Sequence, residues 1–307
     1  MIQNNLDPSA QEFLVNLTRI QTGIRRATDQ ISSGLKVNTP SDAPDQISEI
    51  LQLYVDMGRN AQLQSNLARM QSEVGTAETA LDTAIRAVDR ARTLASTGAG
   101  TMQSAETRLV LAGEVQSLLE QLVSASRTVG VGRYIFSGDE DQAPAYEINL
   151  LEPNGVNRLL TSTSTRQIQH PSGVSFTAQK TAQDIFDARN ADDTYATDNV
   201  FAAVNGLRVA LESNDQPGIE AALSALRGAG DHLNIELGFY GAAQNKIAED
   251  TNFLSKLDVR LKTELSNRRD ADLTAAILEL ERGKVHEQAA LTARAQVPRT
   301  SLFDYLR

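Results

Sequence analysis

The three histidines are the side chains best suited to bind a metal ion or to transfer a proton near neutral pH. His170, His232 and His286 lie far apart in the sequence and show no His-Glu-x-x-His spacing. The chain contains no cysteine, which excludes disulfides, thiolate ligands and a cysteine nucleophile. We therefore interpret the histidines as surface or packing residues and predict no metal site.

Two short segments could bind an ion or a phosphate, and neither has the full pattern. Asp139-Glu140-Asp141 is acidic but lacks the alternating ligands, central glycine and distal glutamate of a calcium-binding loop. Gly130-x-Gly132 follows a helical pattern, whereas glycine-rich phosphate loops follow a strand. No arrangement of serine, histidine and acid typical of a hydrolase stands out. We predict that the protein is not an enzyme, has no catalytic residues and uses no cofactor.

The net charge of −10 is concentrated in the middle of the chain. Between Gly138 and Asn199 there are ten acidic and four basic residues, which account for over half of the net charge. An acidic chain with no basic stripe is poorly suited to bind nucleic acid. No stretch is apolar enough to cross a bilayer, and residues 1–5 lack the pattern of a secretory signal. We expect neither nucleic acid nor a membrane among the partners.

The elements that must give this chain its function are long amphipathic helices. From Leu6 to Gly34, apolar or small residues recur in alternating steps of four and three. This heptad pattern predicts a helix with one narrow apolar stripe that faces a partner helix. The stripe, which we call the N-terminal seam, consists of Leu6, Ala10, Phe13, Leu17, Ile20, Ile24, Ala27, Ile31 and Gly34.

The same rhythm returns twice before the pattern changes. It runs from Leu63 to Ala95 and from Leu111 to Val129, with glycines between that predict an antiparallel turn. Residues 138–199 are instead rich in Pro, Asn, Gly, Ser and Thr with short alternating runs, which indicates short strands joined by turns. Helical periodicity resumes near Val200 and continues to about Ala295.

These patterns predict a mainly α fold in which both chain ends form a long antiparallel coiled-coil or helical-bundle rod. A small β-rich domain is inserted in the middle, and the last helix is expected to pair with the first. We predict three parts: a terminal coiled-coil core (1–38 and 275–307), a helical rod (39–137 and 200–274) and an outward-facing insert (138–199). A purely intramolecular bundle without an assembly role remains an alternative.

Several segments resemble the bacterial flagellin superfamily over nearly the whole chain. Gln30-Ile31-Ser32-Ser33-Gly34-Leu35-Lys36-Val37-Asn38 is similar to the signature that ends the first coiled-coil helix of flagellins. Within the superfamily, the branch at the hook–filament junction, the hook-associated proteins, is the most similar. That similarity lies in Pro40-Ser41-Asp42-Ala43-Pro44, Gly132-Arg133-Tyr134-Ile135-Phe136-Ser137-Gly138 and the ending Ser301-Leu302-Phe303-Asp304-Tyr305-Leu306-Arg307. Two segments depart from that branch: Gln296-Val297-Pro298 is closer to flagellin, and Gly241-Ala242-Ala243-Gln244-Asn245 lacks the family's usual arginine.

The resemblance implies a structural component of the flagellum that joins the hook side to the flagellin filament by helical self-assembly. Its implied partners are further copies of itself, the first hook-associated junction protein, flagellin, an export chaperone and the flagellar type III export apparatus. It also implies an extracellular location reached without a cleaved signal peptide. The alternatives are filament flagellin itself or a secreted adhesion module whose insert binds a surface ligand.

The candidate site is therefore an assembly interface made of apolar side chains from both ends of the chain. An exposed apolar tip at the C-terminus favours burial between molecules. The residues that we expect to carry assembly are Phe13, Leu17, Ile20, Ile24, Ile31, Leu302, Phe303 and Leu306.

Overall fold

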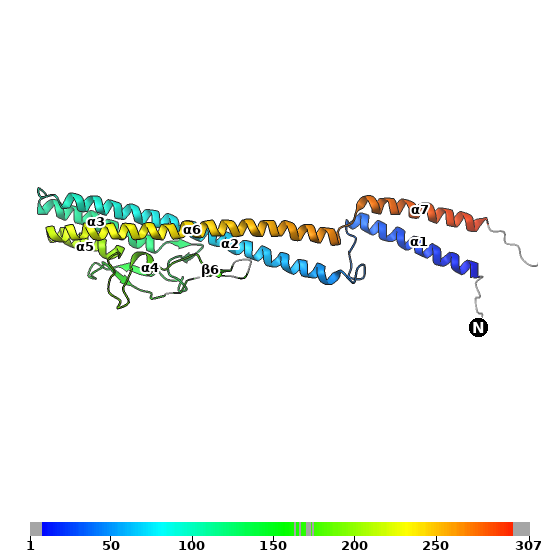
Figure 1. Ribbon diagram of the computed structural model, residues 1–307, viewed down its shortest axis with the longest axis horizontal. Coiled ribbons are helices and arrows are strands. Elements are labelled where there is room, and N and C mark those ends of the chain that lie inside the picture. Colours follow the sequence, from blue (N-terminus) through cyan, green and yellow to red (C-terminus); the bar gives the residue numbers. More distant parts are fainter. Residues whose placement is uncertain (1–7, 163, 166, 170–172, 174, 297–307) are drawn as a thin grey trace, which may run out of the picture. The chain divides into compact units, whose positions relative to one another are not determined.

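The computed structural model describes residues 8–296 except 163, 166, 170–172 and 174 (Figure 1). The chain divides into two compact units, one made of residues 1–59 and 257–307 and the other of residues 60–256. The three-part division predicted from the sequence stays a prediction. The predicted fold class is confirmed, since long helices dominate and a small region with short strands lies in the middle of the chain.

The first unit pairs the two ends of the chain. Helix α1 (Pro8–Ser33) packs against helix α7 (Leu273–Ala295), as expected for the first and last helices (Figure 1). The guanidinium of Arg294 lies over the Phe13 ring, and Gln21 donates a hydrogen bond of 2.9 Å to Glu287. At the other end of the pair, the Ala271 amide donates to the Gly34 carbonyl at 2.9 Å. The two helices are therefore antiparallel.

A short linker follows α1 and another precedes α7, and the backbones of these two regions are joined by hydrogen bonds. Gly34 has a φ of +72°, the left-handed conformation in which glycine commonly ends a helix. The Lys36 amide then donates to the Arg269 carbonyl at 2.8 Å. Asp272 caps the start of α7 by accepting hydrogen bonds from the Thr274 and Ala275 amides.

An apolar cluster within the same unit stabilises these linkers. Helix α2 (Ile47–Gly98) contributes its first turns, and helix α6 (Gln216–Arg269) contributes its last turns. Because Pro40 and Pro44 disfavour helical angles at the residues before them, α2 begins only after the linker. The cluster's buried side chains are Val37, Ile50, Leu53, Leu261 and Leu265.

The second unit contains four long helical segments. The remainders of α2 and α6 lie together with helix α3 (Ala105–Ser126) and helix α5 (Val200–Glu212) (Figure 1). The second predicted heptad stripe forms the core face of α2, where Val74, Leu81 and Val88 are fully buried. Ser104 caps α3 and Asn199 caps α5, each through a side-chain oxygen that accepts a backbone amide.

In the described residues between α3 and α5 there are three separate two-stranded hairpins and a short helix, and the first hairpin precedes the predicted insert. The antiparallel pairs are β1 (Val129–Gly130) with β2 (Arg133–Tyr134), β3 (Tyr146–Ile148) with β4 (Val156–Arg158), and β5 (Gln167–Gln169) with β6 (Ser175–Thr177). Helix α4 (Ala182–Phe186) follows, closed by a Thr181–Asp184 capping box. Short hairpins of this kind are marginal alone and must pack on other elements.

A cluster of aromatic rings joins the insert to the helices of the second unit. The Phe186 ring lies 5.7 Å from Phe136 and 5.7 Å from Phe201, measured between centroids. Phe136 also meets Tyr240 of α6, and Tyr146 of β3 meets Phe201 of α5. Although aromatic residues make up only 5% of the chain, these five are fully buried together in one cluster.

Candidate assembly interface

Within α1, the residues of the N-terminal seam lie on the side that faces α7. Phe13, Leu17, Ile20, Ile24 and Ile31 are each half-buried, and Ala27 is fully buried. On α7, Gly283 leaves room for Ile24, because a Cβ on this glycine would lie 2.7 Å from Ile24 Cγ1. Five of the predicted interface residues therefore come together along the contact between the two chain ends. The other three, Leu302, Phe303 and Leu306, lie outside the described residues.

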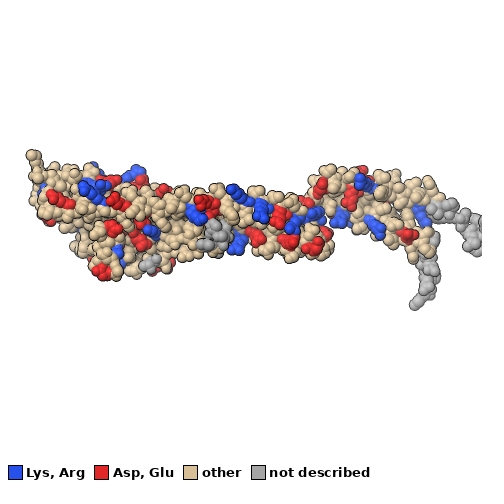
Figure 2. Space-filling view, viewed as in Figure 1, with Lys and Arg blue, Asp and Glu red and all other residues tan. Residues whose placement is uncertain are grey.

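The pairing leaves much of its apolar surface uncovered. On α7, Leu278 is 51% exposed and Val285 is 63% exposed. The two residues are seven positions apart, so they lie on the same side of the helix. On α1, Val15 is 60% exposed. On the side in view in Figure 2, the surface of the α1–α7 pair is mostly uncharged, with few acidic or basic side chains. Further half-exposed side chains of this kind are Leu14, Leu273, Ile277 and Leu291.

Sequence reasoning missed this outward apolar surface because it followed the seam alone. Leu278 and Val285 stand seven residues apart on the side of α7 away from Ala276, the buried residue of that helix. A search of α7 for a second apolar stripe would have found them. A helix pair with apolar residues on both the inner and outer sides buries only one of the two by itself.

Of the segments considered above for metal or phosphate binding, His232 and Gly130-x-Gly132 are engaged in packing and in a turn, respectively. His232 of α6 places Nε2 2.9 Å from the Asp184 carbonyl and Nδ1 3.4 Å from Asp198. His286 is exposed on α7, and His170 lies outside the described residues. Val131 and Gly132 have φ of 52° and 78°, so the Gly130-x-Gly132 segment forms the tight turn between β1 and β2. Within the described part of the chain, no group of three acidic or histidine side chains could hold a metal ion.

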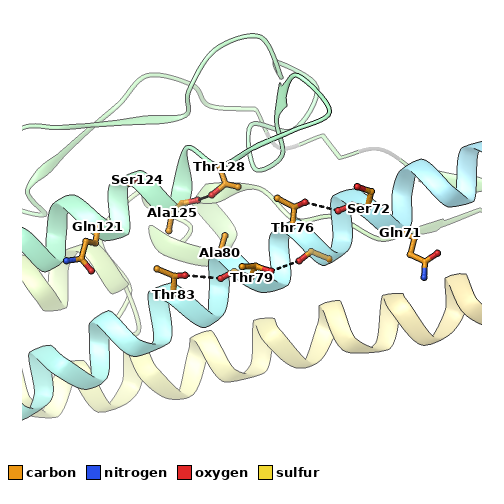
Figure 3. A pocket seen from close by; sticks show the side chains of 11 residues that line it. Gln71, Ser72, Thr76, Thr79, Ala80, Thr83, Gln121, Ser124, Ala125 and Thr128 are labelled. Carbon is orange, nitrogen blue, oxygen red and sulfur yellow. Dashed lines mark hydrogen bonds between the residues drawn. The ribbon is translucent and has the colours of Figure 1, made fainter.

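The groove between α2 and α3 is lined by several hydroxyl side chains, and three of these on α2 are bonded to their own helix. Thr76, Thr79 and Thr83 each donate to the carbonyl one turn earlier, at 2.8 to 3.0 Å (Figure 3). The described residues that line this groove include no titratable side chain. It therefore offers no acid, base or activated nucleophile for catalysis. Among the helices that the structure describes, none has a stretch long and apolar enough to span a bilayer.

Comparisons with known proteins relate both helical ends of the chain to flagellar proteins. A family model of the bacterial flagellin N-terminal helical region matches residues 5–141, and one of the flagellin C-terminal helical region matches residues 223–306. The chain is 26% identical over 303 residues to flagellar hook-associated protein 3 of Salmonella typhimurium, covering 92% of each chain. It is 24% identical to the protein of the same name from Escherichia coli, covering 95% of this chain and 96% of that one.

Solved structures share the fold at lower identity. A protein of Vibrio parahaemolyticus assigned to the flagellar hook-associated proteins superposes with a TM-score of 0.65 at 21% identity, covering 75% of this chain and all of that one. The flagellar junction protein of Legionella pneumophila superposes with a TM-score of 0.54 at 14% identity, covering 66% of this chain and 99% of that one.

Proposed function

Since the chain belongs to the bacterial flagellin family, whose models match both of its helical ends, we propose that it is a structural adaptor of the flagellum that joins the hook to the filament. Its similarity over nearly full length to flagellar hook-associated protein 3 supports this role over that of filament flagellin. The observation that carries the proposal is the α1–α7 pair, which is formed by the matched ends and retains exposed apolar side chains along both helices.

Assembly would complete the burial that the pair begins. Each half-exposed leucine or valine that becomes covered contributes about 1 kcal/mol to association. Because the covered surface repeats from copy to copy, contacts of this kind propagate along a helical array. We propose that the seam residues set the α1–α7 pairing and that Val15, Leu278 and Val285 contact neighbouring molecules.

The same role indicates which neighbouring proteins the chain contacts and how it reaches its location. We propose that one side of the array contacts the first hook-associated junction protein and the other contacts flagellin, and that the protein is extracellular. Export through the flagellar type III apparatus requires an unfolded chain, and the absence of cysteine means that no disulfide opposes unfolding. An export chaperone would cover the apolar C-terminal region before secretion. The role is structural, without catalysis or a cofactor.

Deletion of the gene tests the role directly. We expect the deletion strain to retain hooks, release flagellin monomers into the medium and lose motility. Full-length filaments on the deletion strain would overturn the adaptor role, and loss of filaments without released monomers would indicate filament flagellin instead. Copy number provides a second measure, since an adaptor must be far scarcer than flagellin in purified filaments.

Two substitutions separate pairing from assembly. Ile24→Asp places a charge against Gly283 in the seam and should weaken α1–α7 pairing by several kcal/mol, about the cost of burying an unpaired charge. Val285→Asp adds the same charge on the outward side and should leave the pairing intact while preventing assembly. Gln288→Asp, at an exposed polar position one turn further on, is the matched control. Strains with either of the first two variants should release flagellin, and normal swimming by both would show that these residues do not carry assembly.

A further inference from the structure

A groove of about 470 Å³ runs along one side of the α1–α7 pair. Two glycines line it: a Cβ on Gly23 of α1 would meet no atom within 4 Å, and Gly283 of α7 has no side chain to fill the space. Ile20 and Ile24 of α1 and Leu278 of α7 add apolar surface. Pockets that hold a small ligand measure about 300–1,000 Å³, so this groove is large enough for a few side chains.

The edge of the groove carries both signs of charge. Its charged or titratable side chains are Glu279, Arg282 and His286, all from α7 and all exposed. An apolar groove with such an edge favours a segment that has apolar side chains together with an acid and a base.

The C-terminal segment 301–307 has this composition. It lies outside the described residues, and its aliphatic and phenylalanine side chains are Leu302, Phe303 and Leu306. The segment also contains one acid, Asp304, and one base, Arg307. Asp304 is complementary to Arg282, and Arg307 is complementary to Glu279. The groove and the segment therefore match in both polarity and charge.

The segment is long enough to reach the groove of its own chain. Because Pro298 disfavours helical angles at Val297, α7 is not expected to continue past this point. Thirteen residues of helix separate Gly283 from Gln296, a rise of about 20 Å. The seven residues from Gln296 to Phe303 span up to about 23 Å when extended. Phe303 can therefore lie at the level of the two glycines.

The side of α7 between the groove and the end of the helix leaves room for this path. His286, Ala289 and Ala293 follow one another at steps of three and four residues, so they continue the side that lines the groove. Ala289 and Ala293 are small, uncharged and exposed. A short tether also gives an effective concentration on the order of 1 mM, far above that of other copies in dilute solution. The groove therefore favours the chain's own segment over that of a second copy.

We propose that, in the single molecule, segment 301–307 docks in this groove of its own chain. Phe303 fills the space between Gly23 and Gly283, and Asp304 lies beside Arg282. The docked segment covers Leu278, one of the residues proposed above to contact neighbouring molecules. In that respect the inference rests on the proposed function, because a neighbouring molecule that binds there has to displace the segment.

Disulfide trapping in the dilute purified chain tests the docking, because the chain has no cysteine of its own. Ser301→Cys with His286→Cys should form an intramolecular disulfide about tenfold faster than Ser301→Cys with Gln288→Cys, measured by mass spectrometry. Gln288 is the matched control because it is exposed and nearer to the end of α7 but does not line the groove. Equal rates would overturn the docking. Disulfide-linked dimers as the main product would also overturn it, since they would place the segment on a second copy.

Filling the groove provides the second test. Gly23→Leu places a side chain in it, and Gly58→Leu makes the same change on α2 outside the groove; a Cβ at either glycine would meet no atom within 4 Å. We expect trypsin to cleave after Arg299 about tenfold faster in the Gly23→Leu chain than in the Gly58→Leu or unsubstituted chain. Amide exchange in α1 checks that the α1–α7 pair persists. Equal cleavage of all three chains would overturn the docking.

Both experiments use the dilute purified chain, so a result against the docking leaves the adaptor role standing. Full-length filaments on the deletion strain would instead defeat the adaptor role, whatever the result of the trapping.

Discussion

At the scale of single residues, the insert is held by one buried carboxylate. Asp187 has no exposed surface and accepts hydrogen bonds from Tyr146, Asn154, Asn199 and Arg189. The donors come from β3, the turn before β4, the cap of α5 and the loop after α4, so one side chain connects four parts of the unit. These four donors satisfy the buried carboxylate oxygens with hydrogen bonds from within the protein.

The tyrosines of this region make the stability of the second unit sensitive to alkaline pH. Burial and the neighbouring Asp187 raise the pKa of the Tyr146 phenol, and burial raises the pKa of the Tyr240 phenol. A group whose pKa is raised by folding stabilises the fold fully below its unfolded pKa. That contribution is lost as pH rises from about 10, the usual pKa of tyrosine, toward the raised values.

We therefore expect the free energy of unfolding to fall as pH rises above about 10, with phenolate absorbance from these two residues appearing only on unfolding. Denaturant unfolding followed at increasing pH measures this. Tyr146→Phe should be less stable at neutral pH by about 1 kcal/mol or more, because Asp187 loses a donor, and should show a shallower alkaline decline. Phenolate from Tyr146 and Tyr240 in the still-folded protein would contradict the argument.

At the scale of elements, the heptad pattern predicted the long helices because helix packing repeats the same local rule along the chain. The heptad pattern did not predict three features of the structure. The break at residues 270–272 depends on the Ala271–Gly34 bond, a partner more than two hundred residues away. The insert's hairpins rely on an aromatic cluster whose members are scattered from Phe136 to Tyr240, so local alternation placed their strands only roughly. The outward apolar side of α7 is left exposed by the described parts of the chain, so no predicted partner helix pointed to it.

Two glycines in the α1–α7 pair should respond in opposite ways to the same substitution. A Cβ at Gly23 of α1 would meet no atom within 4 Å, so Gly23→Ala should stabilise the helix by up to about 1 kcal/mol. A Cβ at Gly283 of α7 would lie 2.7 Å from Ile24 Cγ1, so Gly283→Ala should force Ile24 aside and cost about 1 kcal/mol. Amide hydrogen exchange in α1 measures both. Stabilisation by both substitutions would show that α7 does not pack closely on the seam.

At the scale of the whole molecule, the two units differ in how much of their surface they bury. The second unit holds the aromatic cluster and long runs of fully buried side chains on α2, α3 and α5. In the α1–α7 pair, the buried residues of the described helices are Ala27 and Ala276. Alanine burial contributes little, so pairing of the ends is the weaker part of the fold.

We expect a fragment of residues 60–256 to fold by itself, with a cooperative thermal transition close to that of the same region in the full chain. The dilute full chain should show an additional transition at lower temperature, from loss of the α1–α7 pair. Circular dichroism of both chains measures this, with hydrogen exchange assigning each transition. Strong protection of α1 and α7 in the dilute full chain would contradict the expectation, and so would a fragment without a cooperative transition.

The antiparallel union of α1 with α7 also sets an order of events. If α1 leaves a ribosome or a secretion channel first, α7 is almost the last segment to leave, and the reverse holds if α7 leaves first. Neither the ribosome nor a secretion channel can therefore deliver a molecule whose ends have already met. Closure of the termini has to wait until the whole polypeptide is free, so the α1–α7 pair cannot guide folding while the chain is still being made.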